Sequence, residues 1–310
     1  MAPLPSPPRA RIGAPDFNQH GEDWPHRDAS EFHRVGQAIW HIQRMGPTTH
    51  ADDTPPPIAL LLHGTGASTH SLMDVMPLVA RTHDTIAIDL PGHGFTQTPA
   101  SFQPNQVAVA KAIKALLQQL GVQPSLIVGH SAGAAVMLAL ADDGLASSTA
   151  LVSLNGALTP FPGIAKVLFP ATAQLLTLGG ITANLLAGSA RNRLRVERLL
   201  EQTGGSPDAH YIDRYWTLLQ CSAHVSGALR LMANWDLSRM EAIVSRLENP
   251  MLFLAGSQDQ AVNPDDAARL ATLAPKATAL RLDRLGHLAH EQDAPRVWGG
   301  VSDWLGAVSQ

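Results

Sequence analysis

The sequence has only one cysteine, Cys221, in 310 residues, and it carries little charge. A single cysteine excludes an intramolecular disulfide and fits a reducing compartment, so we interpret Cys221 as a small buried side chain. Charged residues make up 15% of the chain, and the formal net charge is −4. Because there is no excess of positive charge, we expect no nucleic acid among the partners.

Long apolar runs are also absent. No stretch reaches about 18 uninterrupted apolar residues, so we expect no transmembrane helix. The first nine residues, Met1 to Arg9, lack the apolar centre of a secretory signal, which predicts a cytoplasmic protein. The length and the 45% hydrophobic content suit one large α/β domain with an inserted subdomain.

Strand and helix patterns alternate along most of the chain. Residues 1–30 are rich in proline and polar groups, and we expect an extended lead-in there. The apolar–polar alternation at 32–45 predicts an antiparallel hairpin at a sheet edge. Helices are expected near 71–80, near 107–120, directly after the strand at 126–130, near 264–273, and from 294 onward. The predicted parallel strands are 58–62, 85–89, 126–130, 150–154, 250–255 and 278–282.

The alternation stops between residues 157 and 249, where the sequence is helical without a strong strand. We therefore predict an α/β fold: a mostly parallel central sheet with helices on both faces. Residues 31–156 and 250–310 would form this core. Residues 157–249 would form a helical cap inserted after the sixth strand, over the edge where such sheets bind ligands.

The segment Gly129-His130-Ser131-Ala132-Gly133 lies between a predicted strand and an alanine-rich helix. In this context G-x-S-x-G predicts a nucleophile elbow, a strand-to-helix turn so tight that glycines are needed on either side. Ser131 is the predicted nucleophile. The pentapeptide by itself is common in a chain with 25 glycines, so the strand–turn–helix context carries the prediction.

A serine nucleophile needs a base, and the base needs an orienting carboxylate. Asp259 and His287 each follow a predicted strand, in the chain order that this architecture requires, and we predict that they complete a triad with Ser131. The alternatives are Asp236 as the acid and His290 as the base. His287 and His290 as metal ligands are a weaker alternative without a third ligand, so we predict no metal and no organic cofactor.

An oxyanion hole needs two N–H donors beside the nucleophile. We predict that Ala132 N–H and Thr65 N–H provide them, the latter from the loop His63-Gly64-Thr65-Gly66 after the first parallel strand. An ordinary glycine turn is the alternative interpretation of this loop. His63 and His130 are expected to pack or hydrogen-bond beside the site.

The predicted cap contains an uncharged stretch from Val167 to Ala190, followed by the arginine-rich segment Arg191–Arg198. We interpret the stretch as cap helices that line a pocket for a hydrophobic small molecule. Peripheral contact of the cap with a membrane is the second interpretation. The arginines favour a solvated helix face, with substrate carboxylates or anionic headgroups as the alternative partners.

Taken together, the motifs resemble those of the α/β-hydrolase superfamily, over nearly all of the chain after residue 30, and the resemblance implies the α/β-hydrolase fold. Within it they are similar to the bacteriochlorophyll-biosynthesis hydrolases known as magnesium-chelatase accessory proteins. An aromatic residue often follows His63–Ser71 in that family, where this chain has Leu72, a difference that concerns the pocket lining. The matching segments are Trp24–Arg27, His63–Ser71, Asp89–Thr96, Gly129–Ala135, Asn155–Leu158, Asn234–Leu237 and Leu285–Glu291.

The resemblance implies a role in (bacterio)chlorophyll synthesis near the insertion of magnesium into protoporphyrin, without an established reaction. We expect a serine hydrolase that cleaves a carboxylic ester of a hydrophobic molecule. The resemblance implies a tetrapyrrole as substrate, magnesium chelatase as a partner, and a place at the periphery of the photosynthetic membrane.

The alternative is a tetrapyrrole-binding accessory or scaffold protein for magnesium chelatase in which Ser131 is dispensable. Carbon–carbon bond hydrolases and cofactor-free perhydrolases share the elbow and stay open. An aspartate nucleophile is excluded because Ser131 occupies the elbow.

Overall fold

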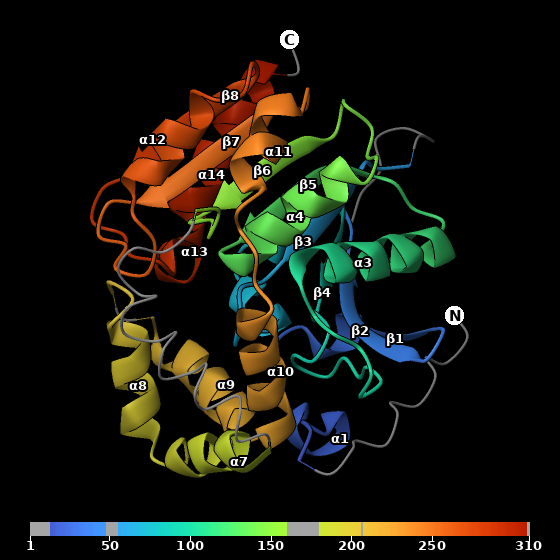
Figure 1. Cartoon of the computed structure of the whole chain (residues 1–310), viewed down its shortest axis with the longest axis vertical. Coiled ribbons are helices and arrows are strands. Elements are labelled where there is room, and N and C mark those ends of the chain that lie inside the picture. Colours follow the sequence, from blue (N-terminus) through green and yellow to red (C-terminus); the bar gives the residue numbers. More distant parts are fainter. Residues whose placement is uncertain (1–12, 48–54, 160–179, 206, 309–310) are drawn as a thin grey trace.

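The computed structural model describes residues 13–47, 55–159, 180–205 and 207–308. Its centre is an eight-stranded sheet in the order β1-β2-β4-β3-β5-β6-β7-β8 (Figure 1). β1 and β2 form an antiparallel hairpin at one edge, β2 is antiparallel to β4, and the remaining neighbours are parallel, as the sequence predicts. The strands are β1 (Ser30–Val35), β2 (Ala38–Met45), β3 (Ile58–Leu62), β4 (Asp84–Ile88), β5 (Pro124–His130), β6 (Ala150–Leu154), β7 (Met251–Gly256) and β8 (Ala277–Leu282).

The apolar run of β3 is explained by helices on both faces of the sheet. Successive side chains of a strand point to opposite faces. Leu60 and Leu62 belong to one apolar cluster, and Ala59 and Leu61 belong to the other. Both faces of the central strands are therefore dry, which requires a continuous apolar sequence.

The face with Leu60 and Leu62 is covered by α3 (Gln106–Leu120), α4 (Ala132–Asp142), α11 (Met240–Arg246) and α12 (Asp265–Ala271). The face with Ala59 and Leu61 is covered by α2 (Met76–Val79) and α14 (Ala294–Val308). α3 shows why these segments are helical. Asn105 caps its first turn, because its Oδ1 accepts the N–H of Ala108 at 2.8 Å, and Gly121 ends it with φ +67°.

The predicted helix at 71–80 is instead two short pieces. A 3₁₀ turn, η2 (Thr69–Leu72), precedes α2, and Pro77 stands in the first turn of α2. Proline has no N–H, and its ring clashes with the carbonyl four residues earlier in a helix. A single helix through Pro77 is therefore disfavoured.

The lead-in also differs from an extended segment over its described part. Residues 13–29 contain α1 (Phe17–His20) and the 3₁₀ turn η1 (Arg27–Ala29), while residues 1–12 lie outside the described residues. Phe17 and Trp24 are buried with Phe95 of the core and Leu218 of the cap. The apolar side chains of the lead-in thus hold it against the domain.

Four helices between β6 and β7 gather at one end of the sheet (Figure 1). They form the helical cap that the sequence predicts after the sixth strand, although residues 160–179, which include most of the uncharged stretch, lie outside the described residues. Every helix within the described ranges is too short or too polar to cross a lipid bilayer. The cap helices are α7 (Gly180–Ser189), α8 (Arg193–Glu201), α9 (Ala209–Leu219) and α10 (Ser222–Ala233).

Candidate active site

Ser131 stands at the turn between β5 and α4, with φ +50° and ψ −114°. This is an unfavourable conformation for a residue with a side chain, and it turns the chain sharply from strand to helix. A Cβ on Gly129 would lie 2.6 Å from Gly133 O, and one on Gly133 would lie 2.4 Å from Leu62 O. The two glycines are therefore required by the close approach of strand and helix, as the motif predicts.

Asp259 and His287 are brought together by the loops after β7 and β8. His287 Nδ1 donates a hydrogen bond of 2.8 Å to Asp259 Oδ2. The other oxygen, Asp259 Oδ1, accepts the N–H groups of Ala261 and Val262, each at 2.8 Å. The carboxylate is thus fixed by its own loop, and it holds the imidazole with its Nε2 free of the proton.

His287 lies beside the elbow. His130, the residue before Ser131, donates from Nε2 to the carbonyl of His287 at 3.1 Å, and the two rings are 4.9 Å apart. Within the described residues no hydrogen bond joins Ser131 to His287. In resting enzymes this contact is often long and tightens when substrate binds.

The loop after β3 passes close to the nucleophile. A Cβ on Gly64 would lie 3.1 Å from the Cβ of Ser131. Gly64 O accepts hydrogen bonds from His63 Nδ1 at 2.7 Å and from Ala67 N at 3.3 Å. In the described part of the chain, neither of the predicted oxyanion donors, Thr65 N–H and Ala132 N–H, is engaged by another acceptor. Both remain available to a ligand at Ser131.

The alternative triad members lie elsewhere. His290 is fully buried, with Nε2 3.0 Å from Ser71 Oγ and its ring 4.3 Å from that of His130. Burial, followed by the charge of His287, lowers the pKa of His290 to about 3. Asp236 follows α10, where its Oδ1 accepts the N–H of Ser238 at 3.0 Å. The structure therefore pairs Asp259 with His287, and neither Asp236 nor His290 belongs to this pair.

One turn of the cap contacts both the loop after β7, which carries Asp259, and the loop after β8, which carries His287. Thr203 O accepts the N–H of His287 at 3.0 Å and the N–H of Gln260 at 3.2 Å. Gly204, with φ +105°, would place a Cβ only 2.0 Å from Gln258 O. The cap thus contacts both loops that carry the Asp259–His287 pair.

Apolar side chains of the cap pack against two of the loops beside the site. Val196 and Leu200 of α8 and Ile212 of α9 pack in one cluster with Ala67 of the loop after β3 and with Leu288, the neighbour of His287. The arginines of α8 are oriented differently. Arg193 pairs with Asp213 at 2.7 Å, and Arg195 and Arg198 are exposed. The face of α8 toward the site is apolar, and the arginines form the solvated face.

A buried carboxyl links the cap to the core behind His287. Glu291 Oε1, in α13 (Ala289–Gln292), accepts a hydrogen bond from Tyr215 Oη of α9 at 2.8 Å and another from Ser71 Oγ. Burial raises the pKa of Glu291 to about 8, although the hydrogen bonds from Ser71 and Tyr215 act to lower it. Burial thus favours the protonated form of the Glu291 side chain.

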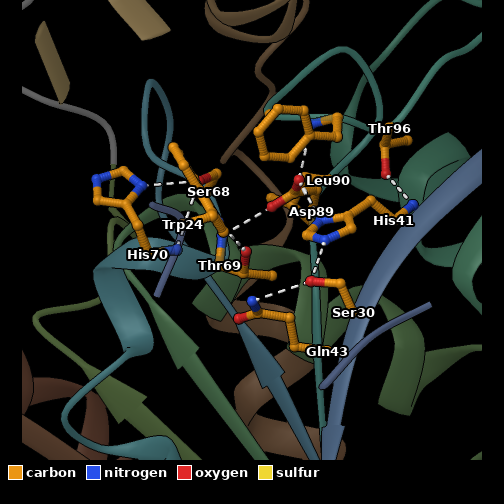
Figure 2. Close-up of polar contacts among 12 residues, drawn as sticks. Trp24, Ser30, His41, Gln43, Ser68, Thr69, His70, Asp89, Leu90 and Thr96 are labelled. Atoms are coloured by element: carbon orange, nitrogen blue, oxygen red, sulfur yellow. Dashed lines mark hydrogen bonds and ion pairs between the residues drawn. The ribbon is translucent and has the colours of Figure 1, made fainter. Parts of the chain in front are cut away.

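A second histidine–carboxylate pair supports the loop after β3 (Figure 2). Asp89 Oδ2 accepts His41 Nδ1 at 2.7 Å, and Asp89 Oδ1 accepts the N–H of Thr69 at 2.7 Å. Burial acts to raise the pKa of Asp89, but the charge and hydrogen bond of His41 outweigh it and hold that pKa below its usual range. His41 Nε2 lies 3.1 Å from Ser30 Oγ, so serine, histidine and aspartate meet here too. Ser30 is buried whereas Ser131 is partly exposed, so we interpret this second group as structural.

The part of the chain that the structure describes holds no group of three His, Cys, Asp or Glu side chains placed to bind a metal ion.

Asn155 also belongs to the site, although the sequence assigned it no role. It directly follows β6, at the same sheet edge as Ser131. Asn155 Nδ2 donates to Asp259 Oδ2 at 2.8 Å and lies 3.2 Å from Gly286 O. Its position after a buried strand was the signal that could have found it.

Comparisons with known proteins agree with the fold of this chain. Residues 57–294 match the family model described as alpha/beta hydrolase fold. A protein of Rhodobacter capsulatus named Magnesium-chelatase 30 kDa subunit is 38% identical over 283 residues, covering 91% of this chain and 96% of that protein.

Solved structures with low sequence identity share the fold. The epoxide hydrolase CorEH superposes with a TM-score of 0.73 at 17% identity, covering 90% of this chain and 99% of that one. The meta-cleavage product hydrolase CumD of Pseudomonas fluorescens IP01 gives a TM-score of 0.70 at 19% identity, covering 90% and 98%. The motifs, the sheet order, the family model and the close relative together show that this chain belongs to the α/β-hydrolase family.

Proposed function

We propose that this protein is a serine hydrolase that cleaves a carboxylic ester of a hydrophobic molecule. The observation that carries the proposal is the strained turn at Ser131 beside the hydrogen-bonded pair Asp259–His287. Ser131 would be the nucleophile, His287 the general base and acid, and Asp259 the residue that orients the imidazole.

In the acylation step, Ser131 Oγ attacks the ester carbonyl carbon while His287 Nε2 takes the Oγ proton. The carbonyl oxygen becomes an oxyanion, which accepts hydrogen bonds from Thr65 N–H and Ala132 N–H. The tetrahedral intermediate collapses, the C–O bond to the alcohol breaks, and His287 gives its proton to the leaving oxygen. The products of this step are the free alcohol and an acyl ester on Ser131.

In the deacylation step, His287 takes a proton from water as the water attacks the acyl carbon. The same two N–H groups stabilise the second oxyanion. Collapse breaks the bond to Ser131 Oγ, which receives the proton from His287. The acid product leaves, and the enzyme returns to its starting state.

A hydrophobic substrate is supported by what covers the site. The apolar side chains of α8 and α9 reach Ala67 and Leu288, so a molecule entering between cap and core would meet apolar surface. A binding site lined by such side chains would favour apolar ligands with few polar groups. The acyl or alcohol part of the ester is therefore expected to be large and apolar.

The proposal that this ester belongs to a tetrapyrrole has a different support. The relative from Rhodobacter capsulatus carries the name of a magnesium-chelatase subunit. Tetrapyrroles are large apolar molecules with carboxylate side chains, which can carry ester groups. We propose a tetrapyrrole ester as the substrate class and an association with magnesium chelatase at the membrane periphery.

The test compares wild type with Ser131→Ala on two sets of esters. The first set is p-nitrophenyl esters of increasing acyl length, and the second is porphyrins with and without a methyl ester. We expect turnover by wild type to rise with apolar size and to vanish in Ser131→Ala. Ser245→Ala removes an exposed hydroxyl of α11 and should keep wild-type turnover. Turnover by the Ser131→Ala variant equal to wild type would overturn the proposal.

A second candidate function is a tetrapyrrole-binding accessory or scaffold protein for magnesium chelatase, and the name of the close relative favours it. It predicts that porphyrin binds wild type and Ser131→Ala equally, without ester hydrolysis by either. Fluorescence titration of both proteins with a porphyrin, together with product analysis of its methyl ester, distinguishes the two functions.

A further inference from the structure

His224, on cap helix α10, lies between two loops of the core and is 1% exposed. Its Nδ1 accepts the N–H of Gly94 at 3.0 Å, and its Nε2 lies 3.0 Å from Gly66 O. Because Nδ1 is the acceptor, the single hydrogen of a neutral ring is on Nε2 and is donated to Gly66 O. Burial lowers the pKa of His224 to about 4, which keeps the ring in this form at neutral pH.

Two peptide groups connect the hydrogen bond at Gly66 O with Thr65 N–H, the predicted oxyanion donor. Gly66 O belongs to the same peptide plane as the N–H of Ala67, and that N–H donates to Gly64 O at 3.3 Å. Gly64 O in turn belongs to the same plane as Thr65 N–H. In a trans peptide the C=O and the N–H point in opposite directions, so fixing Gly64 O fixes the direction of Thr65 N–H.

The position of His224 is set by a close contact of α10 with the core. A Cβ on Gly227 would lie 2.0 Å from Gly92 O, so helix and loop touch backbone to backbone. Gly227 is three residues after His224 and shares its face of the helix. Leu231, one turn further along that face, is fully buried in the core.

We propose that His224 is a positioning residue through which the cap orients Thr65 N–H toward the oxyanion. The inference rests on the proposed function, because it assigns Thr65 N–H to the oxyanion hole. It goes beyond that function in making catalysis depend on a cap side chain that does not touch the reacting atoms.

Two substitutions separate the two hydrogen bonds of His224. In His224→Gln the terminal amide reaches the position of Nε2 and can still donate to Gly66 O. In His224→Asn the shorter side chain reaches only the position of Nδ1, so it keeps the bond from Gly94 and loses the bond to Gly66. Each variant loses one bond, so a purely structural role predicts similar losses of stability and activity in both.

We expect kcat for an aryl ester to fall by about 10- to 100-fold in His224→Asn, somewhat less than the loss of a whole oxyanion donor. His224→Gln should keep kcat near wild type, and KM should change little in either variant. Equal losses of kcat that follow equal losses of melting temperature would overturn the proposal. Unchanged kcat in both variants would overturn it as well.

A measurement that does not depend on ester hydrolysis separates this inference from the proposed function. The Ala67 amide should exchange its hydrogen faster in His224→Asn than in His224→Gln, measured by NMR on the full chain. If wild type hydrolyses no ester but this difference is present, the proposed function fails while the positioning of the loop stands. Equal exchange in both variants contradicts the positioning.

A variant that leaves His224 itself unchanged tests the same link. Gly227→Ala forces α10 away from Gly92 and should lower kcat and speed Ala67 exchange in the same way as His224→Asn. Gly188→Ala on α7, where an added Cβ meets nothing within 4 Å, is the control and should change neither. A Gly227→Ala protein that folds and keeps wild-type kcat and exchange would contradict the inference.

Discussion

Asn155 Nδ2 donates a hydrogen bond of 2.8 Å to Asp259 Oδ2, the same oxygen that accepts the hydrogen bond from His287 Nδ1. Asn155 itself has φ +47°, a conformation that asparagine tolerates better than most residues. Asp259 is therefore oriented from three sides: by its own loop, by His287 and by the residue after β6. All three groups donate hydrogen bonds to the carboxylate oxygens of Asp259, which fixes the direction of the side chain.

Asn155→Asp should lower kcat for ester hydrolysis by about 10- to 100-fold. The change removes a hydrogen bond to a charged group, worth about 1.5–3 kcal/mol, and places a second carboxyl beside Asp259. Asn155→Gly is the control, because it tolerates the same backbone conformation and removes the donor without adding charge. It should lose less activity than Asn155→Asp. A steady-state kcat of Asn155→Asp equal to wild type would show that Asn155 does not support the pair.

Asp259→Asn should lower kcat on the order of 10⁴-fold while the protein stays folded. An amide can donate a hydrogen bond to His287 Nδ1, which leaves the proton on Nε2, where it cannot accept from Ser131. The measurement is kcat for an aryl ester alongside the melting temperature. A modest loss of activity would mean that the Asp259–His287 pair does not set the tautomer used in the reaction.

Glu291→Gln should change how stability depends on pH. The pKa of Glu291 is raised to about 8 in the folded protein, above about 4.3 in an unfolded chain. The folded state thus binds the proton more tightly, so this group contributes stability below the unfolded pKa. That contribution is lost as pH rises through the folded pKa. Glutamine is neutral at every pH and keeps an oxygen for Tyr215 and Ser71.

The melting temperatures of wild type and Glu291→Gln, measured from about pH 5 to about pH 9, test this prediction. The difference between the melting temperature of Glu291→Gln and that of wild type should become more positive as pH rises. Glu248→Gln, which removes an exposed carboxylate, is the control and should run parallel to wild type. Parallel curves for wild type and Glu291→Gln would mean that Glu291 titrates normally in the folded protein.

Gly204→Ala should loosen the cap from the catalytic loops. The new methyl group would lie 2.0 Å from Gln258 O, and alanine is strained at φ +105°. We expect a loss of about 1–3 kcal/mol of stability and a lower kcat, because Thr203 O would withdraw from His287 N–H. Chemical denaturation and ester hydrolysis measure both. Gly188→Ala in α7 should keep activity, and the prediction fails if the two variants behave alike.

Most of the fold follows from local sequence patterns. Ser131, Asp259 and His287 could be proposed because each follows a predicted strand of a parallel sheet, where carboxyl ends meet at one edge. Pro77 shows the limit of periodicity, since the apolar pattern near it fits a helix but the proline ring does not.

The contacts of the cap could not be predicted in the same way. His224 reaches Gly66, and Tyr215 reaches Glu291, across 158 and 76 residues of sequence. These pairs depend on how α9 and α10 dock on the core, which is set by backbone contacts such as Gly92 with Gly227. No local spacing in the sequence encodes that arrangement.

Labelling with a fluorophosphonate probe tests the central claim most directly, because the probe reacts with a serine that a base has activated. Wild type should be labelled, Ser131→Ala and His287→Ala should not, and Ser245→Ala should be labelled like wild type. Circular dichroism of each protein confirms that it is folded. Labelling of folded Ser131→Ala, or no labelling of folded wild type, would contradict the account of Ser131 as the activated nucleophile.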